Sequence, residues 1–410
     1  MEPAEFFWEA EKMEMKYTGA LAERFTSEFG KSPAAFVSSP GRTELGGNHT
    51  DHQHGRVVAA AVTLSLEAAA CATTDGHLRV FSRGMPPVDV DTTSLDADAS
   101  ERGSSAALVR GIAAGFAAKG MDLAGRGIAL SVDGDVPVGS GLSSSACFEL
   151  LVAKAMDELL FSGDIPASEL AKMAQAAENR YFGKPCGLMD QLTVACGGVL
   201  AIDFADPQTP KTEKLALDLD AAGYALCLID SGAGHEGLTD EYAAITRDMC
   251  AVANELGKGV LREAPESEFY SKLPRLREKL GDRAVLRAMH FYAEDARAAA
   301  EADALRRSDI DAFLTLVRES GRSSAMYLQN LSVTGETRCQ PLLLTQSVCE
   351  HILAGRGAVR VHGGGFAGSV LAFVPGDELD EFVRGVNGVL GNGACTVLYL
   401  RAEGPTVSRV

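Results

Sequence analysis

Residues 136–146 read Val-Pro-Val-Gly-Ser-Gly-Leu-Ser-Ser-Ser-Ala, so two spaced glycines are followed closely by three consecutive serines. The alternating residues 127–132 before this stretch predict a strand, and the segment from about Ser144 to Leu160 predicts a helix. A glycine-rich turn between strand and helix directs unpaired backbone N–H groups and the positive helix end at one point, where serine hydroxyls add donors. The stretch therefore predicts an anion-binding loop that needs no Lys or Arg. The alternative is a serine-rich helix cap after a tight turn.

Strands and helices are mixed along the rest of the chain without a regular alternation, which favours an α+β fold over a doubly wound sheet. Further strands are predicted at 57–72, 76–82, 222–231, 359–362, 369–374 and 396–401. Further helices are predicted at 5–30, 106–119, 168–182, 239–256 and through most of 283–356. A composition shift at Asp206-Pro-Gln-Thr-Pro210 predicts a domain boundary, with domains of residues 1–205 and 206–410.

The charge balance limits the classes of partner. The 410 residues include 38 basic and 56 acidic side chains, a net charge of −18, which argues against binding to nucleic acid or to an anionic membrane. Nine cysteines without CxxC pairs indicate free thiols in a reducing compartment. The acidic opening Met-Glu-Pro-Ala-Glu is unlike a secretory signal, and the apolar stretch 57–72 carries Glu67. We therefore expect a cytoplasmic protein with small-molecule ligands, as a monomer or weak homo-oligomer.

A second glycine motif, Gly363-Gly-Gly-Phe-Ala-Gly368, matches the GxGxxG pattern of dinucleotide-binding folds. The residues after it read as a strand instead of a helix, and only 42 residues follow Gly368. We therefore predict a tight glycine turn close to a ligand or to another backbone.

Two polar segments are candidates for ligand contact. Asn48-His-Thr-Asp-His-Gln-His-Gly55 is a loop suited to hydrogen bonding with a polar ligand, and metal binding or plain surface polarity are the alternatives. Asp190 lies in the glycine-flanked apolar stretch Pro185–Gln191, where a buried carboxylate needs a cation or hydroxyl partner. Arg42, in a predicted tight turn with Pro40 and Gly41, is a candidate partner. The structural alternative is an ion pair between two loops.

Taken in order, these segments resemble the GHMP small-molecule kinases and, within them, the galactokinase family. Residues 39–51 are similar to the signature PGRVNLIGEHTD, and residues 137–146 are similar to PxGxGLSSSA. Residues 187–191 are similar to GIMDQ, and residues 361–368 are similar to MTGGGFGG. The resemblance implies a two-domain α+β fold with the active site in the cleft between the domains.

The resemblance also implies a role for each matching residue. Asp190 would accept the proton of the sugar's anomeric hydroxyl, and Arg42 would orient Asp190 and stabilise the transferring phosphoryl group. The predicted ATP-binding loop comprises Gly139, Ser140, Gly141, Leu142, Ser143, Ser144 and Ser145. Ser145 and Glu178 would bind Mg²⁺. The predicted sugar contacts are Asn48, His49, Thr50, Asp51, Gly187, Asp190 and Tyr242.

The chain departs from the galactokinase pattern where Glu44 replaces Asn, Gly46 replaces Ile, Asn48 replaces Glu and His52 replaces the Tyr that follows the signature. Glu at position 48 would accept a hydrogen bond from the sugar's C6 hydroxyl, and an amide there loses the charge assistance. We therefore expect Asn48 to tune the choice of sugar. The predicted activity is ATP- and Mg²⁺-dependent phosphorylation of galactose at C1. The alternatives are another sugar (a hexuronic acid, arabinose, fucose or an N-acetylhexosamine) or a non-catalytic sugar- and ATP-binding sensor.

Overall fold

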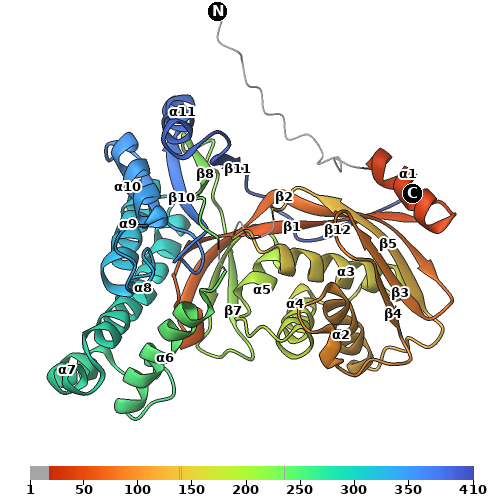
Figure 1. Cartoon of the computed structure of the whole chain (residues 1–410), viewed down its shortest axis with the longest axis horizontal. Helices are drawn as coiled ribbons and strands as arrows, with labels where there is room; N and C mark the ends of the chain where they lie inside the picture. The colour runs from red at the N-terminus through yellow and green to blue at the C-terminus, as the bar shows by residue number, and fades with distance from the viewer. Residues whose placement is uncertain (1–17, 138, 140, 235) are drawn as a thin grey trace, which may run out of the picture.

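The molecule is built on two mainly antiparallel sheets. A computed structural model describes residues 18–137, 139, 141–234 and 236–410. Within these residues, eight strands form the first sheet in the order β12-β1-β2-β5-β3-β4, with β6 paired to β2 and β7 to β6 (Figure 1). Four strands form the second sheet in the order β11-β8-β10-β9. The pairing of β3 with β5 is parallel.

The first sheet comprises β1 (Ala35–Gly46), β2 (Arg56–Thr73), β3 (His77–Ser82), β4 (Val88–Asp91), β5 (Gly127–Gly134), β6 (Val199–Asp203), β7 (Lys211–Leu215) and β12 (Thr406–Arg409). The second comprises β8 (Tyr224–Asp230), β9 (Ala358–Val361), β10 (Ser369–Pro375) and β11 (Cys395–Leu398). The α-helices are α1 (Thr18–Phe29), α2 (Ser105–Ala118), α3 (Ser144–Leu160), α4 (Ala167–Ala176), α5 (Met189–Cys196), α6 (Thr239–Glu255), α7 (Glu266–Leu280), α8 (Asp282–Arg306), α9 (Ile310–Ser323), α10 (Pro341–Leu353) and α11 (Leu379–Leu390). Short helical turns are η1 (Asp51–Gln53), η2 (Ala99–Glu101), η3 (Ala177–Phe182), η4 (Leu261–Glu263), η5 (Ser324–Leu328) and η6 (Gly376–Glu378).

Helices cover both faces of the first sheet, and successive side chains of β2 point alternately to one face and the other. Ala68 and Ala70 pack with α2–α5 on one face, whereas Ala69 and Cys71 pack with α1 on the other (Figure 1). Because β2 is buried on both faces, its sequence reads as a nearly continuous apolar run.

A shared core joins the two sheets. Val58 and Val62 of β2 belong to one buried cluster with Leu226 and Leu228 of β8 and Phe373 of β10. The opposite face of the second sheet packs against α10 and α11. The segments adjoining β2, β8 and β10 therefore meet at the junction of the two sheets.

The predicted tight turn at Arg42 is wrong. Arg42 lies within β1, which pairs with β2 along almost its whole length. The register shifts between Pro40 and Gly41, and such a bulge accommodates a proline that cannot donate to the strand ladder. The Pro-Gly dipeptide marks a bulge in a buried strand, and the strand gives Arg42 a fixed position.

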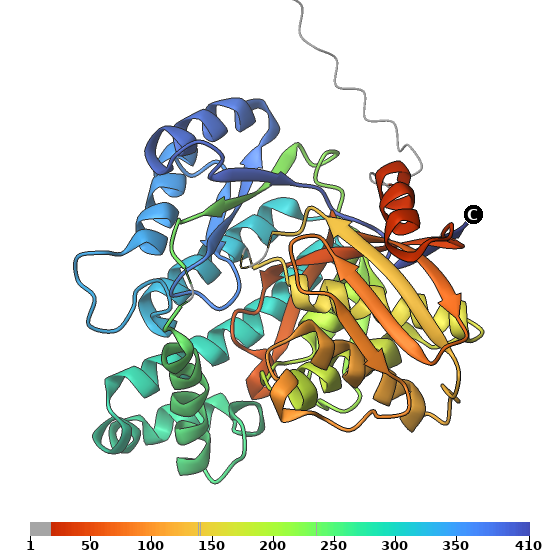
Figure 2. The same cartoon turned by 45° about the vertical axis from the view of Figure 1, so that its right-hand side comes forward.

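The other predicted strands and helices are present to within a few residues, and the predicted α+β class is confirmed. The first part of the predicted helix at 5–30 lies outside the described residues, and the remainder is α1. The boundary at residue 206 stays a prediction. Two strands from beyond it, β7 and β12, belong to the first sheet. Consequently the C-terminus lies beside α1 in both views (Figures 1 and 2).

The nine cysteines are free. In the part of the chain that the structure describes, no helix has both the length and the apolar character needed to cross a membrane.

Candidate active site

The segment between β5 and α3, here the β5–α3 segment, leads into the N-terminus of α3, where Ser143, Ser144 and Ser145 are half-buried. α3 begins at Ser144, and its N-cap residue Ser143 has a left-handed backbone with φ of 57°. Gly141 has φ of 85°, and a Cβ there would lie 2.7 Å from Nδ1 of His362, so glycine is required. Gly139 and Leu142 line a large pocket. The predicted loop residue Ser140 lies outside the described residues.

Arg42 joins this segment to the carboxylate of Asp190. Its Nε and Nη2 donate to Oδ1 and Oδ2 of Asp190 over 2.7 and 2.6 Å, a bidentate pair. Its Nη1 donates to the backbone carbonyl of Gly141, and its backbone N–H donates to the carbonyl of Leu142 over 3.0 Å. Ser143 Oγ donates to Oδ2 of Asp190 over 2.6 Å. The five residues form one connected unit.

Asp190 is held ionised and within reach of a ligand. Burial acts to raise its pKa, but Arg42 and the hydrogen bonds from Arg42 and Ser143 outweigh burial and lower the pKa below its ordinary value. The side chain remains 30% exposed. Asp190 also lies in the first turn of α5, where the helix dipole favours negative charge.

Ser145 and Glu178, the predicted metal ligands, lie next to each other. Ser145 Oγ donates to Oε1 of Glu178 over 3.2 Å, and Lys184 Nζ donates to the same oxygen over 3.1 Å. A hydroxyl and a carboxylate are hard oxygen donors of the kind that Mg²⁺ prefers, with water and phosphate oxygens completing its shell. Among the described residues no group of three or more His, Cys, Asp or Glu side chains is arranged to hold a metal.

Three residues around this pair were not predicted from the sequence. Gln191 Nε2 donates to Oε2 of Glu178 over 2.9 Å and to Oε2 of Glu149 over 3.2 Å. Glu149 is fully buried, and burial raises its pKa well above the ordinary value. Lys184 was the third residue missed. The signal that could have identified Glu149 is its position as the single carboxylate in the apolar run Ala146–Ala153.

Four of the seven predicted sugar residues lie in the loop between β1 and β2, residues 47–55, here the β1–β2 loop: Asn48, His49, Thr50 and Asp51. A Cβ on Gly187 would overlap the carboxylate of Asp51, so these two predicted contacts are adjacent. Burial and the nearby charge of Asp190 raise the pKa of Asp51. Thr50 Oγ1 lies 2.9 Å from the carbonyl oxygen of Gly47 and 2.5 Å from that of Arg56, so its hydroxyl closes the loop.

His49 and Tyr242 contact the turn between β9 and β10, residues 362–368, here the β9–β10 turn. His49 Nε2 lies 2.9 Å from the carbonyl oxygen of Gly364, and Tyr242 Oη donates to that of Gly365 over 3.0 Å. A Cβ on Gly364 would lie 2.7 Å from the ring of Tyr242. A Cβ on Gly365 would overlap the backbone carbonyl oxygen of Asn330, so the predicted glycine turn close to another backbone is confirmed. Burial raises the pKa of Tyr242 to about 12, so the phenol stays protonated.

Asn48 is completely buried, and its amide is bonded within the protein. Nδ2 donates to Oε1 of Glu44 over 3.0 Å and to the carbonyl of Gly363 over 2.7 Å. Oδ1 accepts from Nδ2 of Asn330 over 2.9 Å and from Oγ of Ser324 over 3.3 Å. Both amide hydrogens and both lone pairs are thus engaged by the chain itself. Sugar contact by Asn48 stays a prediction.

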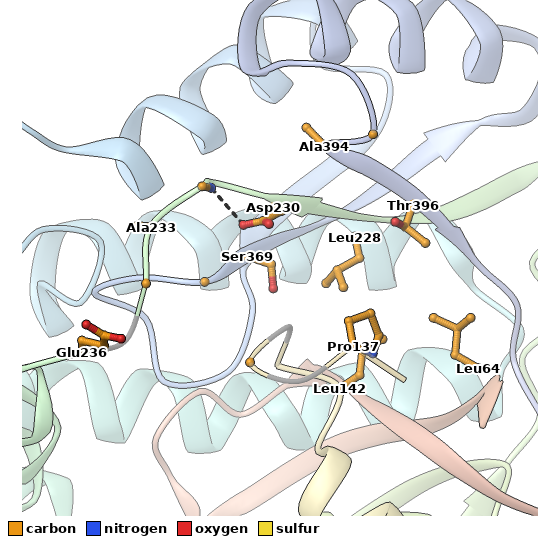
Figure 3. Close-up of a pocket in the computed structure, with 15 residues that line it drawn as sticks. Leu64, Pro137, Leu142, Leu228, Asp230, Ala233, Glu236, Ser369, Ala394 and Thr396 are labelled. Atoms are coloured by element: carbon orange, nitrogen blue, oxygen red, sulfur yellow. Dashed lines mark hydrogen bonds between the residues drawn. The ribbon is translucent and has the colours of Figure 1, made fainter. Parts of the chain in front are cut away.

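A pocket of about 1120 Å³ adjoins the β5–α3 segment. Its lining comes from both sheets and from the segments at their junction, and includes Leu64 of β2 and Leu228 of β8. Figure 3 shows Leu64, Pro137 and Leu228 gathered at one end, with Glu236 at the opposite end. No Lys or Arg is among the described residues that line it. The end lined by Leu64, Pro137 and Leu228 is suited to an apolar group.

Comparison with known families defines the class. Residues 107–198 match the family described as GHMP kinases N terminal domain, and residues 23–72 match the galactokinase galactose-binding signature. The first segment contains Glu178 and Asp190, and the second contains Arg42 and the β1–β2 loop. Together with the fold, these matches define a small-molecule kinase of the GHMP class.

Individual relatives narrow the class further. A galactokinase from Streptomyces coelicolor is 30% identical over 370 residues, which cover 90% of this chain and 92% of the relative. A galactokinase from Actinobacillus pleuropneumoniae is 28% identical over 375 residues, which cover 90% of this chain and 93% of the relative. The chain belongs to the galactokinase family.

Solved structures agree in fold. Lactococcus lactis galactokinase complexed with galactose matches with a TM-score of 0.80 at 24% identity, over 96% of this chain and 100% of that chain. A mevalonate kinase matches with a TM-score of 0.64 at 14% identity, over 90% of this chain and 99% of that chain. The predicted GHMP-kinase-like fold is confirmed.

Proposed function

We propose that the protein transfers the γ-phosphoryl group of ATP to the anomeric hydroxyl of galactose, giving galactose 1-phosphate and ADP. One observation carries this proposal: a carboxylate held ionised by a bidentate arginine lies directly beside a glycine- and serine-rich helix N-terminus. Phosphoryl transfer depends on positioning and charge neutralisation more than on covalent help from the protein. The Arg42–Asp190 unit supplies both at one point.

In the proposed reaction, the oxygen of the C1 hydroxyl bonds to the γ-phosphorus while Asp190 accepts the proton of that hydroxyl. The bond between that phosphorus and the β–γ bridging oxygen breaks, and ADP leaves. Arg42 orients Asp190 through two hydrogen bonds and places positive charge near the transferring group. Because Ser143 binds the same carboxylate, acceptor and donor sites are held in one geometry.

The nucleotide phosphates would lie against the N-terminus of α3, which binds anions through free N–H groups. The base would enter the apolar end of the pocket near Leu64, Pro137 and Leu228. The described pocket lining contributes the carboxylates of Asp230 and Glu236 but no cation. The negative charge of the phosphates would therefore be neutralised by Arg42, by Lys184 and by a bound Mg²⁺. When bound by Ser145 and Glu178, Mg²⁺ would neutralise the phosphate charge.

The sugar would lie among Asp51, His49 and Tyr242. Burial lowers the pKa of His49, so its ring is neutral at pH 7. A carbonyl oxygen only accepts, so the ring proton lies on Nε2, which faces Gly364, and Nδ1 remains an acceptor for a hydroxyl. The Asp51 carboxylate, adjacent to Gly187, offers a stronger acceptor. Carboxylate and imidazole acceptors of this kind suit a sugar rich in hydroxyl groups.

A panel of sugars tests the proposed activity. Galactose should give the highest kcat/KM for ATP-dependent formation of a 1-phosphate, measured against galacturonate, arabinose, fucose and N-acetylgalactosamine. Phosphorus NMR identifies the product through coupling of its phosphorus to the anomeric proton, and a reaction without sugar corrects for ATP hydrolysis. A higher kcat/KM for another sugar would replace galactose in the proposal. Binding of galactose and ATP without turnover would identify a sensor instead.

The magnesium assignment predicts a defect in Glu178→Gln. Removing one anionic oxygen should raise the Mg²⁺ concentration for half-maximal rate by about tenfold or more, because even indirect partners of a metal contribute 10–100-fold to affinity. Calorimetric Mg²⁺ titration with a non-hydrolysable ATP analogue gives a readout besides activity. Glu169→Gln is the control, since Glu169 pairs with Lys119 and Lys172 on the exposed side of α4. Unchanged titration curves for Glu178→Gln would make Glu178 a structural residue.

A further inference from the structure

Behind the β1–β2 loop lies a buried polar cluster that the proposed reaction does not use. We define it by Glu44, Asn48, Arg360 and Asn330, and call it the loop-anchor cluster. Glu44 and Arg360 form an ion pair of 2.5 Å, with side chains 5% and 0% exposed. Glu44 lies on β1 of the first sheet and Arg360 on β9 of the second, so this pair connects the two sheets.

The hydrogen bonds within the cluster require a donor at position 48, which the amide of Asn48 supplies. Asn48 donates to two acceptors, the Glu44 carboxylate and the Gly363 carbonyl. A carboxylate at position 48 would have no hydrogen to donate and would place a second negative charge against Glu44. A buried acceptor facing acceptors costs its full desolvation penalty. Given Glu44, position 48 is therefore restricted to a donor.

The contact between Glu44 and Asn48 joins two positions at which the chain departs from the quoted signature. The signature PGRVNLIGEHTD carries Asn at the position of Glu44 and Glu at the position of Asn48. In this chain the carboxylate and the amide have exchanged places, and the structure shows the two side chains in direct contact. An exchange between touching residues keeps one carboxylate and one amide in the same small volume.

We propose that Glu44 and Asn48 are a reciprocally exchanged pair, in which Arg360 holds the carboxylate at position 44 and Asn48 positions the β1–β2 loop from behind. Asn48 is then a positioning residue that does not touch the sugar. Its backbone supports the same role, because its N–H donates to Glu294 over 3.1 Å and its carbonyl lies 2.9 Å from Nε2 of His290. The proposal rests on the proposed function for its readout with galactose.

The cluster also has a spare donor for the opposite arrangement. Arg360 Nη1 is buried and has no hydrogen-bond partner among the described residues. A carboxylate returned to position 48, with an amide at position 44, would keep one negative charge beside this guanidinium. Restoring the signature at both positions should therefore be tolerated, although restoring it at either position alone should not.

A double-mutant cycle tests the exchange, with Asn48→Glu, Glu44→Asn and the double variant. Each single change should lower Tm by several degrees and raise the KM for galactose by about tenfold or more, since one buried group loses its partner. The KM for ATP should stay unchanged and kcat should change less than the galactose KM, because Asp190 and Arg42 are not altered. The double variant should recover most of both losses.

Glu213→Asn is the matched control, because Glu213 pairs with Arg306 at the surface with side chains 49% and 43% exposed. It should change neither Tm nor the galactose KM appreciably. Single variants that fail to fold beside a double variant that folds would also demonstrate rescue. Additive losses, a double variant that fails to fold, or an Asn48→Glu enzyme with unchanged or lower galactose KM would overturn the exchange. The Tm cycle needs no substrate, so it is informative even if galactose is not phosphorylated.

Discussion

Asp190→Asn should lower kcat by about 10²-fold or more while leaving ATP binding intact. The amide has nearly the shape of the carboxylate but accepts no proton at neutral pH. It also replaces one of the two oxygens that face Arg42 with a donor. Because Arg42 and Ser143 lower the pKa of Asp190, the wild-type group is ready to accept a proton throughout the neutral range. Steady-state kinetics and calorimetric ATP titration measure the two quantities.

The control for this change is Glu101→Gln. Glu101 forms a bidentate pair with Arg110 over 2.8 and 2.6 Å, so the same kind of contact is lost away from the β5–α3 segment. Glu101→Gln should keep kcat near the wild-type value. An Asp190→Asn enzyme with near-normal kcat would exclude Asp190 as the proton acceptor.

Arg42→Lys should also lower kcat by about 10²-fold or more, although the charge is kept. Lysine offers a single ammonium centre and cannot make two parallel hydrogen bonds to Asp190 while it also donates to the carbonyl of Gly141. Both Asp190 and the β5–α3 segment should therefore lose their fixed orientation. Rates of a single turnover at saturating ATP and galactose measure the loss at the chemical step.

Arg110→Lys is the matched control, because it weakens a bidentate pair of similar geometry outside the site. We expect wild-type single-turnover rates for it. If Arg42→Lys changes only the KM for galactose and leaves the single-turnover rate intact, Arg42 contributes to binding and not to the transfer step.

The sequence predicts the long buried elements of this fold well, because strands such as β2 and helices such as α3 carry strong apolar patterns, but it misses the shorter α5 and β6. It does not predict β1 around Arg42, since Pro40 and Gly41 are typical of turns and the bulge that accommodates them depends on pairing with β2. Nor does it predict β12, a four-residue strand whose partner lies more than 360 residues earlier. Such long-range pairing leaves no local pattern.

The site residues divide in the same way, into those that local motifs predict and those that depend on long-range contacts. Residues in contiguous motifs, such as Arg42 and Asp190, are predicted as partners, and the structure joins them directly. Contacts between distant segments are missed. Gly46 departs from the signature Ile, and a Cβ there would overlap the carboxylate of Glu301, which comes from α8. Asn48 is predicted to face the sugar, yet its amide bonds to four groups of the chain, three of them from beyond residue 320.

The pairing of β12 with β1 affects how the chain can fold during synthesis. Thr406–Arg409 supply the outer neighbour of β1, so this edge stays open until these four residues have been made. At about 5–20 residues per second, the roughly 370 residues that separate β1 from the end of β12 require about 20–75 s of translation. Throughout that time β1 presents unpaired backbone groups, which are the usual starting point for pairing with other chains. The chain is therefore open to edge-to-edge pairing with other chains while it is being synthesised, and chains that terminate before Thr406 keep that open edge permanently.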